Sequence, residues 1–266
     1  MQIQPAFSTG PATGAQGVNF PTNSGGTSPG AADGVRADWN VRMNVSHETG
    51  FVGGAGRMLI HNQIAEERTE IVLYLPAARS DQPGRLELAS AVVCSAKPGT
   101  TATAGQNLAF RVEGAEVTVT VPLLKLNDWI YIDLTWTGGF PPGGMAFQGG
   151  QVPLGNFHPQ VAVRVPQEDG RKGLFPIPSR YDVELGSDPG AVVRLESEGF
   201  GKVVSRSGDD GKMTMHEFKS YGKPQIQAVL APPGAIVQPG AAVMEQPTNA
   251  VSTTPSLDAD QPSFNR

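Results

Sequence analysis

The chain has 266 residues, of which 39% are hydrophobic and 17% charged, and its formal net charge is -5. This length allows one large β domain or two small ones. The acidic balance excludes a general electrostatic attraction to nucleic acid or to an anionic membrane surface. The 33 glycines and 23 prolines favour an all-β domain with many turns and with flexible ends.

Two segments lack the apolar patterns of a folded domain. Residues 1–36 consist mainly of Gly, Ser, Thr, Pro and Ala, and residues 232–266 are rich in Pro. Segments that bury little apolar surface do not offset the entropy of ordering, so we expect both to be flexible. The first has neither the basic start nor the apolar core of a signal peptide. No run approaches the roughly 20 apolar residues of a membrane span.

Between these tails, residues 37–231 contain alternating patterns typical of β-strands. In residues 38–46 the side chains of Trp39, Val41, Met43 and Val45 alternate with polar ones, which predicts a half-buried strand. Strands are also predicted over 56–64, 69–77 and 85–94. Residues 108–123 predict a hairpin with its turn at Glu113 and Gly114, and 128–138 predict the clearest strand of the chain.

The stretch 143–185 combines a long Gly-rich loop, a strand at 160–165, a Pro-rich loop and a strand at 181–185. Four further strands are predicted within 191–231 and no helical periodicity is present. About a dozen short strands separated by turn signals predict an antiparallel β-sandwich or saddle. Cys94, the single cysteine, excludes an internal disulfide, and we expect it to be a buried apolar residue.

The order of several motifs resembles the N-terminal β-saddle domain of the aminopeptidase N family of zinc metallopeptidases. The motifs are Leu75-Pro76-Ala77, VTVTVPLLKLNDWIYIDLTWTGGFP at 117–141, LGNFHPQVAV at 154–163 and SRYDVELGSDPGAVVRLESEG at 179–199. The third is similar to a run in the bacterial branch of that family. The resemblance extends over 37–231 and implies a β domain that precedes a helical catalytic domain.

The chain departs from that family at the residues that carry its chemistry. A zinc site of the HExxH type needs two histidines one helical turn apart, with the intervening Glu as general base. In the His-Glu pair His216-Glu217, the position four residues after His216 is Ser220 rather than a second histidine. That segment alternates as a strand does. We therefore expect a chain that is not an enzyme, with no catalytic residues, no metal site and no cofactor.

Other catalytic and ligand-binding patterns are equally incomplete. The four histidines are not spaced as metal ligands, so we expect each to be a solvated or capped surface residue, with His158 the best candidate for a role. There is no nucleophile elbow of the GxSxG type. Asp209-Asp210-Gly211 predicts a hairpin turn rather than a calcium loop, and no glycine pair precedes a helix that would bind phosphate.

Aromatic side chains concentrate in the stretch 143–185. They either fill the open end of the sandwich or form an apolar contact patch for a partner. The candidate binding residues are Phe147, Asn156, Phe157, His158, Phe175 and Tyr181.

These observations favour a non-catalytic binding or scaffolding subunit. It would join a larger protein assembly through the loop face of residues 143–180 and through its tails. Two alternatives remain. One is an accessory domain of a metalloaminopeptidase whose catalytic part is a separate chain. The other is an extracellular adhesive or carbohydrate-binding sandwich, which rests on fold-level analogy. Protein partners are expected, and nucleic acid is not.

Overall fold

The computed structural model describes residues 35–166, 172–196, 202–208 and 211–234. Nearly all regular structure in these ranges is β-strand, as predicted. The strands are β1 (Val35–Ser46), β2 (Phe51–Asn62), β3 (Arg68–Tyr74), β4 (Arg85–Ala96), β5 (Phe110–Glu113), β6 (Glu116–Leu124), β7 (Trp129–Gly139), β8 (Val152–Pro153), β9 (Gln160–Pro166), β10 (Lys172–Pro176), β11 (Ser179–Ser187), β12 (Val192–Leu195), β13 (Val204–Ser207), β14 (Thr214–Lys223) and β15 (Ala228–Ala231). Four short 3₁₀ turns lie between them, at Pro76–Ala78, Pro142–Gly144, Gln148–Gly150 and Leu154–Phe157.

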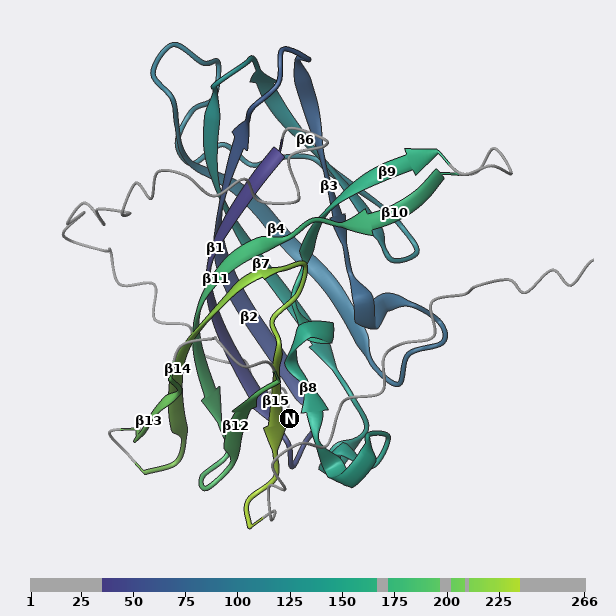
Figure 1. The fold of residues 1–266 in the computed structure, drawn as a ribbon, viewed down its shortest axis with the longest axis vertical. Coiled ribbons are helices and arrows are strands. Elements are labelled where there is room, and N and C mark those ends of the chain that lie inside the picture. The colour runs from purple at the N-terminus through teal and green to yellow at the C-terminus, as the bar shows by residue number, and fades with distance from the viewer. Residues whose placement is uncertain (1–34, 167–171, 197–201, 209–210, 235–266) are drawn as a thin grey trace, which may run out of the picture.

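The strands form three sheets. The largest has seven strands in the order β13-β14-β11-β1-β2-β7-β4, and its long strands extend along most of the molecule in Figure 1. A five-stranded sheet has the order β10-β9-β3-β6-β5, and its β9–β10 hairpin projects from the side of the molecule. A small sheet of order β12-β15-β8 lies toward the lower end of that view.

One strand pair corrects the prediction of purely antiparallel sheets. Strands β1 and β11 are parallel, with Trp39 opposite Tyr181 and Met43 opposite Leu185, whereas the other neighbours of β1 and β11 are antiparallel. A parallel pair needs a long connection between its strands. Local alternation cannot reveal it, because it shows which face of a strand is buried and not the direction of the neighbour.

The predicted alternation of β1 and β7 is confirmed. In β1 the side chains of Trp39, Val41, Met43 and Val45 are buried, and in β7 the same holds for Ile130, Ile132, Leu134 and Trp136. The intervening polar residues of these strands lie on the opposite face of the sheet, because successive side chains of a strand alternate. The two strands thus contribute the centre of one continuous core.

Trp136 fits into this core because the facing position on β2 is a glycine. Gly54 lies opposite Trp136 in the register, and a Cβ at Gly54 would lie 2.3 Å from the Trp136 indole. That distance is far below van der Waals contact. The hairpin predicted at 108–123 is also confirmed: β5 and β6 pair through Glu113 and Glu116, and Gly114 in the turn has a φ of 61°.

The predicted tails fall almost wholly outside the described residues. Strand β1 begins at Val35, two residues before the expected start of the domain, and β15 ends at Ala231, the residue before the expected start of the second tail. Cys94 is half-buried on β4 rather than fully buried, and this burial raises the pKa of its thiol. A raised pKa lowers the thiolate fraction and hence the reactivity of the sulfur.

Candidate functional site

The structure separates the six predicted binding residues into two groups. Phe157, His158 and Tyr181 are fully buried, and Phe147 and Asn156 are half-buried. Phe175 alone among the six has a widely exposed side chain, with 48% of its surface accessible. The first five lie in or against the sandwich, and Phe175 lies on the projecting hairpin. In this conformation the buried three offer no surface to a partner.

His158 is held in one neutral form by two backbone groups. Its Nε2 lies 3.2 Å from the backbone nitrogen of Ile226 and must accept that N–H, so Nδ1 carries the proton and donates to the carbonyl of Pro159 at 2.8 Å. The ring lies 5.0 Å from that of Tyr181 and 6.5 Å from that of Trp39. Burial lowers the pKa of His158 to about 4.

Further bonds fix the segment 154–160, which we call the clamped loop. The indole N–H of Trp136 donates to the backbone carbonyl of Phe157 at 2.9 Å. The side-chain amide of Gln160 donates to the backbone carbonyl of Gly155, also at 2.9 Å. A Cβ at Gly155 would lie 2.7 Å from the carbonyl oxygen of Ile226. The clamped loop thus closes the end of the core against β7 and against the segment that precedes β15.

Three of the four histidines are buried, so the expectation of surface positions is wrong for His47, His158 and His216. A neutral imidazole can be buried when both of its nitrogens find partners. His216 lies between the hydroxyls of Ser187, at 2.9 Å, and Ser205, at 2.8 Å, and burial lowers its pKa. His47 Nε2 lies 2.7 Å from the carbonyl oxygen of Gly150.

The Ser187–His216–Ser205 chain of hydrogen bonds links β11, β14 and β13 rather than forming a catalytic triad. In a triad the second ring nitrogen bonds to a carboxylate that orients the imidazole, whereas here it meets a second hydroxyl. Ser187 is fully buried as well, which excludes a substrate from its oxygen in this conformation. The arrangement therefore satisfies buried polar groups at the edge of the large sheet.

Two absences hold for the part of the chain that the structure describes. Within it, no group of three or more His, Cys, Asp or Glu side chains lies close enough together to hold a metal ion. No helix in the same residues has the length and apolar character that crossing a membrane requires.

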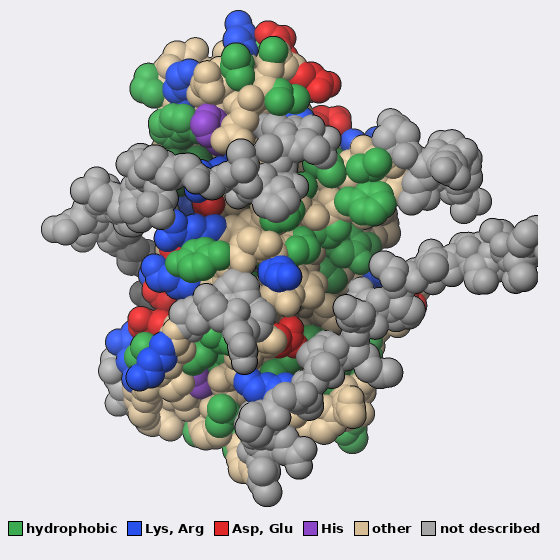
Figure 2. All heavy atoms as spheres, in the orientation of Figure 1, with side chains coloured by type: hydrophobic (Ala, Val, Ile, Leu, Met, Phe, Trp, Pro, Cys, Tyr) green, Lys and Arg blue, Asp and Glu red, His purple; other side chains and the backbone are tan. Residues whose placement is uncertain are grey.

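The β9–β10 hairpin carries apolar side chains past the edge of the core. Phe175 pairs with Val163, and Val165 pairs with Gly173, so these side chains share the face that carries the buried Val161. Along β9 the exposed fraction rises from 2% at Val161 to 39% at Val165. We call Val163, Val165 and Phe175 the overhang. Figure 2 shows hydrophobic side chains gathered on and beside this hairpin.

A cleft of about 410 Å³ opens where β9 separates from β3. Strand β9 pairs with β3 only through Val72–Tyr74, although β3 continues back to Arg68. Arg164 of β9 spans this separation: its Nε donates to Glu116 Oε1 at 2.8 Å, and its Nη2 donates to Thr118 Oγ1 at 2.6 Å. Both acceptors are on β6, on the far side of β3, so Arg164 ties the hairpin to the sheet by side-chain hydrogen bonds that reach across β3.

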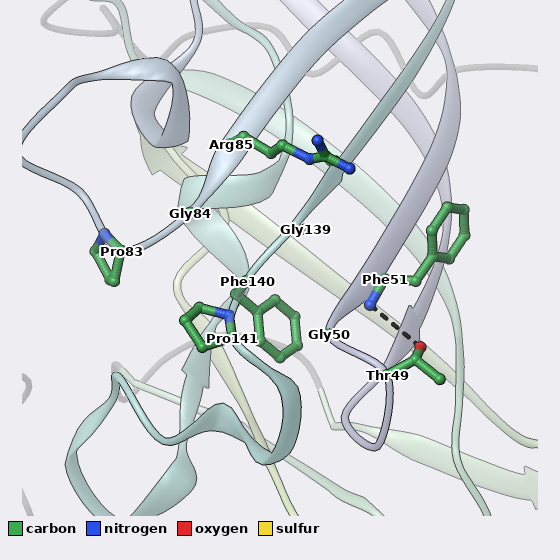
Figure 3. Close-up of a pocket in the computed structure, with 10 residues that line it drawn as sticks. Thr49, Gly50, Phe51, Pro83, Gly84, Arg85, Gly139, Phe140 and Pro141 are labelled. Carbon is green, nitrogen blue, oxygen red and sulfur yellow. Dashed lines mark hydrogen bonds between the residues drawn. The ribbon is translucent and has the colours of Figure 1, made fainter.

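A second hollow, of about 480 Å³, lies at the end of the large sheet (Figure 3). Its floor is formed by glycine backbone. Phe51 on β2 and Arg85 on β4 both lie opposite Gly139 of β7 and therefore flank it on one face of the sheet. Arg85 is the single charged side chain in the described lining. One cation beside an apolar ring supplies a contact point, not the convergent acid and base groups of a catalytic site.

Comparison with known proteins gives similarity at the level of structure. No family model matches the chain, and no curated protein does. Among 151 solved chains that match, the M1 zinc metallopeptidase of Deinococcus radiodurans is 14% identical, with a TM-score of 0.45. A mutant of that peptidase is 15% identical, with a TM-score of 0.44. In both comparisons the match covers 75% of this chain and 42% of the other.

Both solved proteins are zinc metallopeptidases, the class of protein that the sequence motifs resemble. Similarity at this level carries no conclusion about the activity of this chain. The chain is thus similar, over three quarters of its length, to less than half of an M1 zinc metallopeptidase chain.

Proposed function

We propose that the chain is a non-catalytic binding module that joins a protein assembly through the overhang. The observation that carries this proposal is the apolar face of the β9–β10 hairpin, which is core-like at Val161 and leaves Val165 and Phe175 in solvent. Exposed apolar groups that form a continuous patch commonly mark a protein interface. The patch is anchored in the five-stranded sheet, so a partner would meet a preformed surface.

The chemistry of the overhang suits a protein partner. Interfaces are centred on a few aromatic or aliphatic anchors that become fully desolvated, surrounded by a polar rim. Phe175 supplies the aromatic anchor, and Val163 and Val165 flank it on the neighbouring strand. Arg164 lies on the opposite face of β9 and fixes the hairpin through Glu116. The anchor is therefore presented on a strand that is already ordered.

A non-catalytic role is supported by what the histidines do. His158 and His216 each have both ring nitrogens engaged inside the chain, and burial lowers the pKa of both. A general base needs a free nitrogen within reach of a substrate proton. In this chain those nitrogens satisfy the backbone and the serines of the fold instead.

The test is comparative purification from the source cells. The double variant Val165→Ser and Phe175→Ser removes the overhang, and the matched control Val112→Ser and Val204→Ser alters two somewhat more exposed apolar residues elsewhere. Quantitative mass spectrometry should show a set of proteins that copurify with the wild type and the control but are depleted at least tenfold with the overhang variant. Equal recovery with all three chains, or peptide hydrolysis by the purified chain, would contradict the proposal.

A further inference from the structure

We infer that the hollow at the end of the large sheet binds a monocarboxylic acid whose carboxylate is attached to a flat apolar ring. We call this hollow the sheet-end pocket. Its lining comes from β2, β4, β7 and the turns beside them, whereas the overhang belongs to β9 and β10. The inference therefore goes beyond the proposed function and does not depend on it. A volume of about 480 Å³ is within the range of pockets that take small ligands.

The guanidinium of Arg85 is a cation that forms no ion pair within the part of the chain that the structure describes. Its Nε lies 4.0 Å from the place that a Cβ on Gly139 would occupy, so the side chain extends from β4 over β7 (Figure 3). Glu87 is the next residue on the same face of β4, opposite Thr137, and it forms no ion pair with Arg85. Arg85 is thus available for the paired hydrogen bonds that a carboxylate accepts.

Glycine backbone forms a floor that a flat ring can approach closely, because no Cβ atoms stand in the way. The four glycines of the lining are Gly50, Gly84, Gly138 and Gly139. The N–H of Gly50 donates to the backbone carbonyl of Ser46 at 2.9 Å, and the N–H of Phe140 donates to the backbone carbonyl of Gly50 at 2.8 Å. Gly139 is paired with a strand on both sides. The floor therefore offers peptide planes rather than unpaired polar groups.

The rest of the pocket is mainly apolar. The side chain of Phe51 is 45% exposed beside the floor. Figure 3 places Phe140 and Pro141 on the other side of Gly139 from the Arg85 guanidinium. A ligand lying over Gly139 would thus direct its carboxylate to Arg85 and its ring toward these apolar groups. Aromatic rings gain stability from edge or offset contact with one another, which Phe51 can supply.

This lining disfavours two other kinds of anionic ligand. A sugar acid would bury hydroxyls that cost free energy unless they are hydrogen-bonded. Thr49 has the single neutral polar side chain in the described lining, and its hydroxyl oxygen already accepts the N–H of Phe51 at 3.4 Å. A phosphate carries more than one negative charge at neutral pH, whereas Arg85 is the one cation of that lining. One carboxylate on an apolar ring matches both features.

The same chemistry occurs in a free arylalkanoic acid and in the C-terminal aromatic residue of a polypeptide. The probes are therefore 3-phenylpropionate and acetyl-Gly-Gly-Phe, each compared with its uncharged amide, and butyrate as an acid without a ring. Backbone amide shifts of the full chain are followed by two-dimensional NMR. Both the amides and butyrate should bind about tenfold more weakly than the acids with a ring. Added salt should weaken binding of the acids.

Comparison of the two acids identifies the source of the ligand. Affinity for the peptide equal to or above that for 3-phenylpropionate indicates a polypeptide terminus. Affinity about tenfold lower indicates a free acid, because the peptide then gains nothing from its additional residues. Either result supports the inference. In both cases the saturable shifts should include the amides of Gly84 and Gly139, which line the pocket.

Substitutions test the two ends of the ligand separately. Arg85→Gln should weaken binding of the acids about tenfold and leave binding of the amides unchanged. Phe51→Ser should weaken acids and amides alike. The matched controls are Arg111→Gln, at an exposed arginine on β5, and Phe175→Ser, at a phenylalanine of nearly equal exposure, and both should bind as the wild type does. Glu87→Gln removes a neighbouring negative charge and should tighten binding of the acids.

Three results would overturn the inference. They are an absence of saturable shifts, equal affinity for an acid and its amide, and wild-type affinity of the Arg85→Gln chain for the acids. Because Arg85 and Phe51 are exposed, their variants should retain the dispersed spectrum of a folded chain, which the same NMR experiment records. The overhang variant keeps the pocket intact, so the outcome is separate from that of the copurification experiment.

Discussion

The clamped loop and the β9–β10 hairpin follow one another in the sequence, yet their phenylalanine side chains differ in solvent exposure. Phe157 in the loop is 1% exposed, whereas Phe175 in the hairpin is 48% exposed. Both belong to the same Gly- and Pro-rich stretch, and the sequence left open whether they fill the end of the sandwich or form a contact patch. The comparison teaches that aromatic residues in irregular segments indicate a need for burial without showing what covers them.

The physical difference lies in the number of sides on which each segment meets the fold. The clamped loop bonds to Trp136 of β7 on one side and to Ile226 before β15 on another. The hairpin meets β3 over three residues and is otherwise held by Arg164. A segment enclosed by several elements becomes core, while one attached along a single edge keeps its apolar face in solvent.

The largest expected effect comes from truncating the two phenylalanines separately. Phe157→Ala should lower the free energy of unfolding by about 3–5 kcal/mol, because it removes a fully buried ring and leaves a cavity. Phe175→Ala should change it by less than about 1 kcal/mol, as exposed side chains do. Urea unfolding of both variants measures the difference. Similar losses for the two substitutions would remove the distinction between the regions.

The second prediction concerns the acid stability that the clamped loop confers. Burial lowers the pKa of His158 to about 4, below the value of 6.5 expected when the chain is unfolded. The unfolded state therefore binds the proton first as the pH falls, and stability is lost from about pH 6.5 downward. The loss approaches about 1.4 kcal/mol per pH unit, or about 3 kcal/mol by pH 4.

This dependence is measured by urea unfolding at a series of pH values between 7 and 4. His158→Gln cannot be protonated in this range, so its stability should fall less steeply than that of the wild type, even if the variant is less stable at pH 7. Parallel pH profiles for the two chains would show that His158 is not the group responsible. The hairpin should contribute nothing to the difference, and Phe175→Ala should retain the steep wild-type profile.

The smallest expected effect concerns the latch of the hairpin. The hydrogen bond to Glu116 raises the pKa of Arg164, which stays charged. Arg164→Met keeps an unbranched apolar stem but removes the bonds to Glu116 and Thr118, and should cost about 1 kcal/mol of stability, as partly exposed ion pairs do. Amide hydrogen exchange should accelerate in β9 and β10 while the clamped loop keeps its protection. Faster exchange in both regions would show that they open as one unit.

Much of the fold could be predicted because strands that cover a core have a local signature. The alternation in β1 and β7 identified the residues that are buried, and Glu113-Gly114 identified a hairpin turn. The parallel pairing of β1 with β11 could not be predicted, because it depends on which strand lies alongside. The buried histidines were missed for a related reason: one of the two backbone partners of His158, Ile226, is 68 residues away.

The sequence by itself determined that the chain forms an all-β domain, since a period of two in apolar residues requires strands with one buried face. It also indicated that the stretch 143–185 is unusual. Only the tertiary structure decided that the first part of this stretch is core and that the hairpin is left overhanging. Burial depends on how many distant elements converge on a side chain, and that number is a property of the assembled sheets rather than of any local pattern.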